Sequence, residues 1–197
     1  MLEFVPITAN KIVEFGCGAG MFSEQIKERQ NACVYGVDIM SEPLILARQK
    51  LDQVFQRDIE NGLDFLRGEK FDCAIFIDVL EHLKSPWKVL SDLRNYLVEG
   101  GVVVASIPNV RHYEVIKSLI LRKRFEYQDE GVMDRTHLRF FAKDDIIDLF
   151  QDCSYKVTKI TGVQGGFPWK FGLLNKLFFD ALSDMQFKQF GITAIVQ

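Results

Sequence analysis

Residues 13–20 read VEFGCGAG and combine an acidic side chain with closely spaced glycines, a pattern that suits ligand binding. Gly16, Gly18 and Gly20 stand at every second position, and Glu14 comes two residues before the first of them. Glycine at this density weakens a regular element but lets a ligand approach the backbone closely. Three ligands are compatible with such a loop: a phosphate, a dinucleotide, or a nucleoside without a phosphate.

The spacing of the glycines separates these three ligands. A phosphate-binding loop has the pattern GxxxxGK[ST], and no Lys-Ser or Lys-Thr pair follows the glycines. A dinucleotide fingerprint GxGxxG that started at Gly16 would need a third glycine at the position of Met21. The observed pattern, E-x-G-x-G-x-G, therefore favours the nucleoside ligand.

Three aspartates and three histidines offer further chemistry. Asp38, Asp58 and Asp78 each end a strand-like run, in CVYGVD, DQVFQRD and FDCAIFID. Ligands of open α/β sheets bind beyond the carboxyl ends of the strands, so these carboxylates and the glycines are predicted to share one site. The histidines, which can exchange protons near neutral pH, all fall where the mouth of that site is expected; they are His82, His112 and His137.

Strands and helices alternate over the first two thirds of the chain, and the strands are largely apolar. This pattern predicts a parallel sheet that helices cover on both faces. Helices are expected at 21–29, from Pro43 to Lys50, and after Pro86 with Leu90, Leu93 and Leu97 on the buried face. The expected strands are 11–15, 33–38, 52–58, 71–78 and 102–108.

The last third of the chain changes character. Helices are expected at 112–125, with Val115, Ile116, Leu119 and Ile120 inward, and at 142–152; two final strands are expected at 155–162 and 186–196. Between these strands, apolar pairs at 173–174, 177–178 and 181–182 form a helical stripe. The stripe predicts a core-facing helix, with a lid or a dimer surface as the alternative.

The motif E-x-G-x-G-x-G, followed in order by Asp38, Asp58 and the run FDCAIFIDVLEHL, resembles class I S-adenosylmethionine-dependent methyltransferases. The resemblance implies a Rossmann-like α/β fold with a seven-stranded, mostly parallel sheet in the order 3-2-1-4-5-7-6. Only the last strand is expected to be antiparallel.

The resemblance also implies how the cofactor, S-adenosylmethionine, would be bound. The glycines Gly16, Gly18 and Gly20 would contact it through the backbone, and Glu14 and Asp78 would lie near its methionine end. Asp38 would accept bonds from both ribose hydroxyls, and Ile39 would pack on the adenine ring. Asp58 would bind adenine, and Ile59 would contact it through its backbone amide.

The acceptor of the methyl group is expected to be a small molecule, methylated at oxygen. A hydroxyl needs a base or a metal to take its proton. His137 is the first candidate base, because Arg135 and Arg139 flank it and would depress its pKa; His112 and His82 are the alternatives. Those arginines could also bind an acidic substrate, or pair with Asp134 or Asp129.

Two alternatives to a metal-free enzyme remain open. Asp78, Glu81 and His82 form D-x-x-E-H, which resembles the ExxEH of metal-dependent relatives, including ubiquinone-pathway O-methyltransferases, with His137 as a distant ligand. No metal is expected, because Asp replaces the first Glu and VLEHL is common in members without a metal. The second alternative is a regulatory partner protein that binds the cofactor without turnover.

Composition limits the remaining classes. The 197 residues are expected to form one domain, with segments 108–137 and 165–185 capping the substrate, unless a second protomer supplies the cap in a homodimer. The formal net charge of −3 argues against a nucleic-acid or membrane partner. The four cysteines form no CxxC pair, and the chain starts without a signal peptide, so a cytoplasmic location is expected.

Overall fold

The computed structural model describes residues 1–166 and 169–197. Its centre is a seven-stranded sheet in the order β3-β2-β1-β4-β5-β7-β6. β7 pairs antiparallel with both β5 and β6, whereas the pairs among β1 to β5 are parallel. The predicted strand order and the single antiparallel strand are therefore confirmed. The strands are β1 (Lys11–Phe15), β2 (Cys33–Asp38), β3 (Gln53–Gln56), β4 (Phe71–Ile77), β5 (Leu97–Pro108), β6 (Tyr155–Gly165) and β7 (Phe187–Val196).

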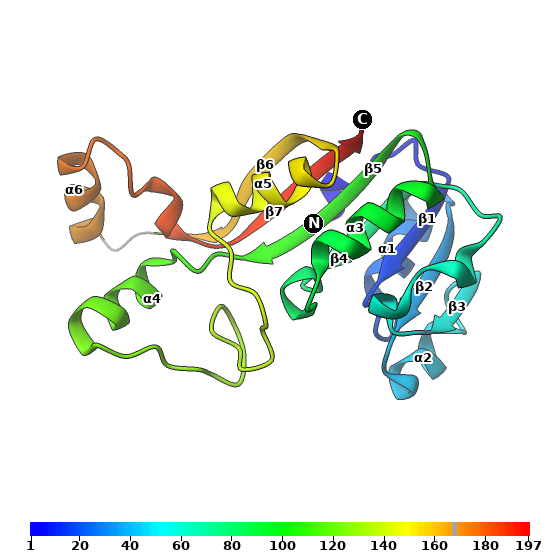
Figure 1. Ribbon diagram of the computed structural model, residues 1–197, viewed down its shortest axis with the longest axis horizontal. Helices are drawn as coiled ribbons and strands as arrows, with labels where there is room; N and C mark the ends of the chain where they lie inside the picture. Colours follow the sequence, from blue (N-terminus) through cyan, green and yellow to red (C-terminus); the bar gives the residue numbers. More distant parts are fainter. Residues whose placement is uncertain (167–168) are drawn as a thin grey trace.

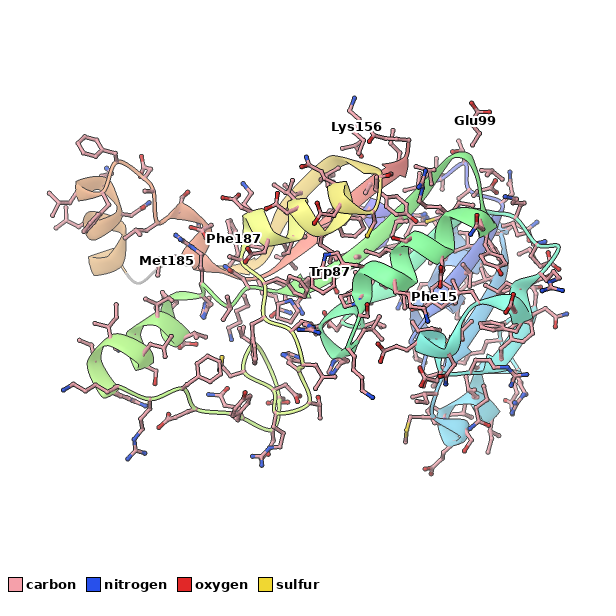
Figure 2. All side chains as sticks on the ribbon, viewed as in Figure 1. Phe15, Trp87, Glu99, Lys156, Met185 and Phe187 are labelled. Carbon is pink, nitrogen blue, oxygen red and sulfur yellow. The ribbon has the colours of Figure 1, made fainter. Side chains whose placement is uncertain are left out.

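Successive side chains of a strand point to opposite faces of the sheet, and a hydrophobic cluster covers each face. One cluster contains Val13 and Phe15 together with buried residues of α3 and α5. The other contains Ile12 together with buried residues of α1 and α2. Figure 2 shows Phe15 in the interior, where its ring stacks on Phe76 at 4.8 Å between centroids. The helices are α1 (Met21–Gln30), α2 (Ser41–Ala47), α3 (Pro86–Leu93), α4 (Tyr113–Lys117), α5 (Lys143–Asp152) and α6 (Trp169–Leu177).

Two expected helices differ from the structure. Leu97 does not continue the buried face of α3, because α3 ends at Leu93 and Leu97 begins β5. The helix expected at 112–125 is only α4 followed by a wider helical turn over Ser118–Arg122. Its apolar spacing does not reflect burial: Val115 is buried, but Ile120 is 68% exposed.

The stripe at 173–182 does not face the core. α6 projects from the sheet at the left end of the molecule in Figure 1, and Leu173, Leu177 and Phe178 are exposed. The predicted core-facing helix is therefore wrong. Residues 167–168 and the side chains of residues 169–171 and 174, which also belong to the predicted segment, lie outside the described parts. Within the described residues, the helices are too short or too polar to cross a bilayer.

Candidate active site

The glycine loop joins β1 to α1 in a conformation that favours glycine. Gly16, Gly18 and Gly20 have φ angles of 72°, 51° and 74°, in the left-handed region. A Cβ atom on Gly16 would lie 2.4 Å from Cγ2 of Val79, whereas one on Gly18 would meet nothing within 4 Å. Gly16 is thus required by packing inside the protein, and Gly18 leaves open space in front of the loop.

Glu14 is buried beneath this loop and connects it to α1. Its side chain is 3% exposed, and it accepts a short hydrogen bond from the hydroxyl of Ser23. Burial raises the pKa of Glu14 to about 7, although the bond from Ser23 opposes that rise. Ser23 was not predicted from the sequence; a serine one turn into a helix is too common to indicate a role.

Asp38 lies beside the glycine loop, as predicted. One carboxylate oxygen accepts a hydrogen bond from the amide of Gly18 at 2.8 Å, and the other accepts one from the amide of Met40 at 2.8 Å. The following residue, Ile39, is 60% exposed. The carboxylate is therefore oriented by backbone donors, with an uncovered apolar side chain next to it.

Asp58 lies two residues beyond the end of β3, which stops at Gln56 rather than at the predicted residue 58, and it caps a short helical turn over Ile59–Asn61. Its carboxylate accepts a hydrogen bond from the amide of Glu60 at 2.9 Å and another from the side chain of Asn61 at 3.2 Å. The side chain of Ile59 is buried in the core, which leaves its backbone as the part available to a ligand. This arrangement is compatible with the contact that the resemblance implies.

Asp78 follows β4 directly and adopts a left-handed backbone conformation, with φ of 52°. The hydroxyl of Ser106 donates to its Oδ1 at 2.7 Å, and the side-chain amide of Gln189 donates to the same atom at 3.0 Å. Ser106 also accepts from the amide of Asp78 at 3.1 Å. Neighbouring strands β5 and β7 thus hold this carboxylate in place, and neither Ser106 nor Gln189 was predicted.

The rings of His82 and His137 are in contact, with centroids 4.7 Å apart, and both line a cavity of about 240 Å³ that we call the histidine cavity. The 137 segment reaches this position because the amides of Leu138 and Arg139 both donate to the carbonyl oxygen of Glu81, at 2.9 and 3.0 Å. Asp78 and Gln189 also line the cavity. Two of the three predicted histidines therefore lie together beside Asp78, one of the predicted cofactor carboxylates.

The hydrogen bonds of both rings leave one nitrogen of each available. Nδ1 of His137 lies 3.1 Å from the carbonyl oxygen of Val132, and Nδ1 of His82 lies 3.3 Å from that of Thr136. A carbonyl oxygen only accepts, so these contacts place the proton on Nδ1 and leave Nε2 as an acceptor. Burial is the main cause that lowers the pKa of His137, which favours the neutral ring.

Glu81 lies beside His82 and His137, and its carboxyl group is buried. It is 1% exposed, and neither carboxylate oxygen has a hydrogen-bond partner among the described residues. Burial raises its pKa to about 8, so the carboxyl is largely neutral at pH 7 in the absence of a cation. Ligand atoms of Glu81, His82 and His137 lie within 4.8 Å of one another. Asp78 is not part of this group, although the D-x-x-E-H motif placed it first.

His112 lies elsewhere. It is 3% exposed and lines a second, larger cavity of about 560 Å³. Its Nδ1 is 3.7 Å from a carboxylate oxygen of Glu114, and burial lowers its pKa. The two cavities adjoin, because Gly131, Val132, Gln164 and Lys188 line both.

The two arginines that flank His137 have other partners. Arg135 forms an ion pair with Asp129 at 2.7 Å, and Arg139 donates to the carbonyl oxygen of Lys84 at 3.1 Å and lies over the ring of Trp87. Neither arginine lines either cavity. The predicted direction of the His137 pKa shift is confirmed, but burial and the neighbouring His82 cause it, not the arginines.

Comparisons with known proteins agree with this arrangement. Residues 2–160 match the family model of a methyltransferase domain. A ubiquinone biosynthesis O-methyltransferase of Glaesserella parasuis is 30% identical over 108 residues, which cover 50% of this chain and 45% of that protein. A mitochondrial protein of the same name from Arabidopsis thaliana is 26% identical over 168 residues, covering 80% and 50%. The chain thus spans about half the length of the curated relatives that it matches.

Solved structures share the fold at low identity. A S-adenosylmethionine-dependent methyltransferase from Archaeoglobus fulgidus superposes with a TM-score of 0.71 at 18% identity, covering 95% of this chain and 86% of that one. N-methyltransferase NodS from Bradyrhizobium japonicum, solved with S-adenosylhomocysteine, superposes with a TM-score of 0.61 at 14% identity, covering 95% and 78%. The family match over most of the chain, together with the strand order and the glycine loop, shows that this protein belongs to the methyltransferase domain family.

Proposed function

We propose that the protein transfers a methyl group from S-adenosylmethionine to a hydroxyl of a small molecule. The observation that carries this proposal is the position of the glycine loop. The loop is bonded to Asp38 on one side, and on the other it packs against Val79, which directly follows Asp78 at the edge of the histidine cavity. A cofactor on the loop and an acceptor in the cavity would therefore be neighbours.

S-adenosylmethionine, when bound, supplies an electrophilic methyl group on a sulfonium centre. In this chain, the backbone around Gly18 and the carboxylate of Asp38 would bind its polar parts, and Asp58 and the backbone of Ile59 would bind adenine. Ile39 would cover the adenine ring, and Asp78 would lie near the methionine end. Together these residues would orient the methyl group, and alignment of this kind supplies much of the acceleration in a displacement reaction.

His137 is the proposed general base. Its Nε2 is free to accept because Nδ1 faces the carbonyl of Val132, and its lowered pKa keeps the ring neutral near pH 7. As the acceptor oxygen would form its bond to the methyl carbon, the bond from that carbon to sulfur would break, its electron pair would stay on the sulfur of S-adenosylhomocysteine, and the hydroxyl proton would move to Nε2 of His137. His82, 4.7 Å away between ring centroids, is the second acceptor in the cavity.

A divalent cation is a second candidate for the same role, and Glu81 is the observation that favours it. A buried carboxyl without a partner is costly, and a cation would satisfy it. One carboxylate oxygen and two imidazole nitrogens form a suitable donor set for Zn²⁺ or another first-row divalent ion. Such an ion, held by Glu81, His82 and His137, would polarise the acceptor hydroxyl and lower its pKa.

The size of the two cavities suggests the kind of acceptor. The smaller one, about 240 Å³, suits a ring-sized group, and the larger one, about 560 Å³, gives room for a further part of the same molecule. Segment 108–137 supplies much of both linings, which supports a role for it as a substrate cap. Relatives named O-methyltransferases support oxygen as the accepting atom. The free cysteines fit a cytoplasmic location.

The test is transfer of a labelled methyl group into a metabolite extract. The protein is incubated with S-adenosylmethionine that carries a labelled methyl group, and labelled products are separated and identified by mass and by NMR. We expect a methyl ether that is absent when Asp38→Ala replaces the wild type. Binding of S-adenosylhomocysteine without any transfer would instead support the regulatory partner protein, and a methylated amine or thiol would exclude the hydroxyl acceptor.

A further inference from the structure

Large apolar side chains are exposed on two segments at one end of the molecule. Two segments project there from the sheet: the turn after α4, and α6 with the residues that follow it. Both lie at the left end of the longest axis in Figure 1. We call this end the apolar tip and define it by six exposed residues: Ile120, Leu121, Phe125, Leu173, Leu177 and Phe179.

The degree of exposure is unusual for such side chains. Leu121 is 69% exposed, Leu177 is 74% exposed and Phe179 is 95% exposed. Single exposed apolar residues are normal on a protein surface, but a group of them at one end marks an interaction site. The tip is therefore expected to be covered by a partner.

The two projecting segments are joined at their base, so the tip is one structural unit. Arg111, just before α4, binds the carboxylate of Asp184, after α6, through two nitrogens at 2.7 and 3.2 Å. The buried side chain of Asn109 donates to the carbonyl oxygens of Asp184 and Phe187, both at 3.0 Å. Figure 2 shows Met185 and Phe187 at this base, where β7 begins.

A run of cations divides the apolar residues of the tip. Arg122, Lys123 and Arg124 follow Leu121 directly and precede Phe125. One acid partly compensates them, since Glu126 lies 3.8 Å from Arg122 and 3.5 Å from Arg124. Residues 122–126 thus carry a net charge of +2, three cations minus Glu126, among exposed apolar side chains, although the whole chain carries a formal charge of −3.

We propose that the apolar tip docks on the surface of an anionic phospholipid bilayer. Apolar side chains that enter the interface and cations that remain at the headgroups are the combination that holds peripheral proteins on such membranes. We expected no membrane partner from the net charge, but a net charge does not describe a local surface. The described helices are unsuited to spanning a bilayer, so the contact would be peripheral.

A second copy of the chain is a poorer partner for this surface. In a two-fold symmetric dimer the same patch faces itself. The run Arg122–Arg124 would then lie near its own copy, where like charges repel, whereas anionic headgroups attract it. The charge of the tip therefore favours lipid over self-association.

Docking would place the larger cavity near the membrane. Leu119, Arg122, Arg124 and Phe125 line the cavity of about 560 Å³ as well as lying in or next to the tip. An acceptor held at the bilayer surface would therefore reach the cavity from its open side. The docking itself does not depend on the identity of the acceptor or on turnover.

The test is co-sedimentation of the full chain with vesicles, compared between phosphatidylcholine alone and phosphatidylcholine with about 30% phosphatidylglycerol. We expect at least tenfold stronger binding to the anionic vesicles, and weaker binding as salt is raised. Ile120→Ser with Leu121→Ser should abolish most of the binding. The triple variant Arg122→Gln, Lys123→Gln and Arg124→Gln should remove the dependence of binding on anionic lipid. Affinity for S-adenosylhomocysteine should not change in these variants.

The matched control replaces two apolar residues that are more than half exposed elsewhere on the surface. Ile45 and Leu46 on α2 are 60% and 52% exposed and lie at the opposite end of the molecule. Ile45→Ser with Leu46→Ser should leave vesicle binding unchanged. Equal binding to both vesicle types, equal binding by the tip variants, or no binding at all would overturn the proposal. So would a dimer in light scattering that the tip variants dissolve.

Discussion

The carboxylate of Asp38 and the amide of Gly18 are joined by a hydrogen bond of 2.8 Å. This bond connects the end of β2 to the glycine loop after β1, two neighbouring strands of the sheet. It orients the carboxylate before any ligand arrives and keeps the loop close to it.

Asp38→Ala should weaken the binding of S-adenosylhomocysteine at least tenfold. Two ribose hydroxyls that donate to a charged acceptor would contribute roughly 1.5–3 kcal/mol each, and about 1.4 kcal/mol corresponds to a factor of ten. Isothermal titration calorimetry measures the affinity. Asp64→Ala, at a side chain that is 84% exposed and far from the loop in sequence, is the control and should bind normally. Unchanged affinity in Asp38→Ala would remove Asp38 from the site.

Gly16→Ala and Gly18→Ala should have different consequences. Both positions have positive φ, so alanine brings backbone strain of about 1–2 kcal/mol at each. At Gly16 the new Cβ would also lie 2.4 Å from Val79, so thermal unfolding should shift further for this variant. At Gly18 the space is open, so the stability loss should be smaller, and affinity for the cofactor should fall more. The reverse order of the two unfolding temperatures would contradict this assignment.

His137→Ala should lower kcat by roughly 10²–10⁴-fold, the usual range for general acid–base catalysis, while cofactor binding stays intact. His112→Ala should act mainly on KM for the acceptor, because His112 lines the larger cavity and not the smaller one. Steady-state kinetics with the acceptor found in the labelling experiment separates the two effects. Full turnover by His137→Ala would point to an acceptor that is already nucleophilic.

If a divalent cation activates the acceptor hydroxyl, a chelator should abolish turnover, and added divalent ion should restore it. Glu81→Gln should weaken the binding of Zn²⁺ or Mn²⁺, measured directly by calorimetry, at least tenfold, because the amide supplies no charge. Glu60→Gln, which lies outside the histidine cavity, should bind the ion as the wild type does. Turnover that is insensitive to chelator would leave His137 as the base.

Glu81 should also make the protein less stable as the pH rises. Its folded-state pKa of about 8 lies above its ordinary value of 4.5, so the folded state holds a proton that the unfolded state releases. Stability from this group is therefore fully present below about pH 4.5 and is lost as the pH rises through about 8. Glu81→Gln should flatten this loss in urea unfolding at a series of pH values. Glu14, with a pKa of about 7, acts in the same direction and should leave a residual slope.

The amino-acid sequence by itself determined the sheet and the edge at which the glycine loop and the acids lie. The strand Cys33–Asp38 ends in an acid, and Asp78 directly follows the apolar strand Phe71–Ile77; this pattern is local. Once the strand order followed from the family resemblance, Gly18 and Asp38 had to lie at the same edge of the sheet. Their hydrogen bond is a consequence of that order.

Only the tertiary structure decided which histidines meet and which apolar residues are buried. His137 reaches His82 because backbone amides of its segment bind the carbonyl of Glu81, a contact between distant parts of the chain that no periodicity records. The same spacing that buries Leu90 on α3 leaves Leu177 exposed on α6. The physical reason is that helical periodicity arranges side chains on one face of a helix, whereas burial depends on whether another element packs against that face.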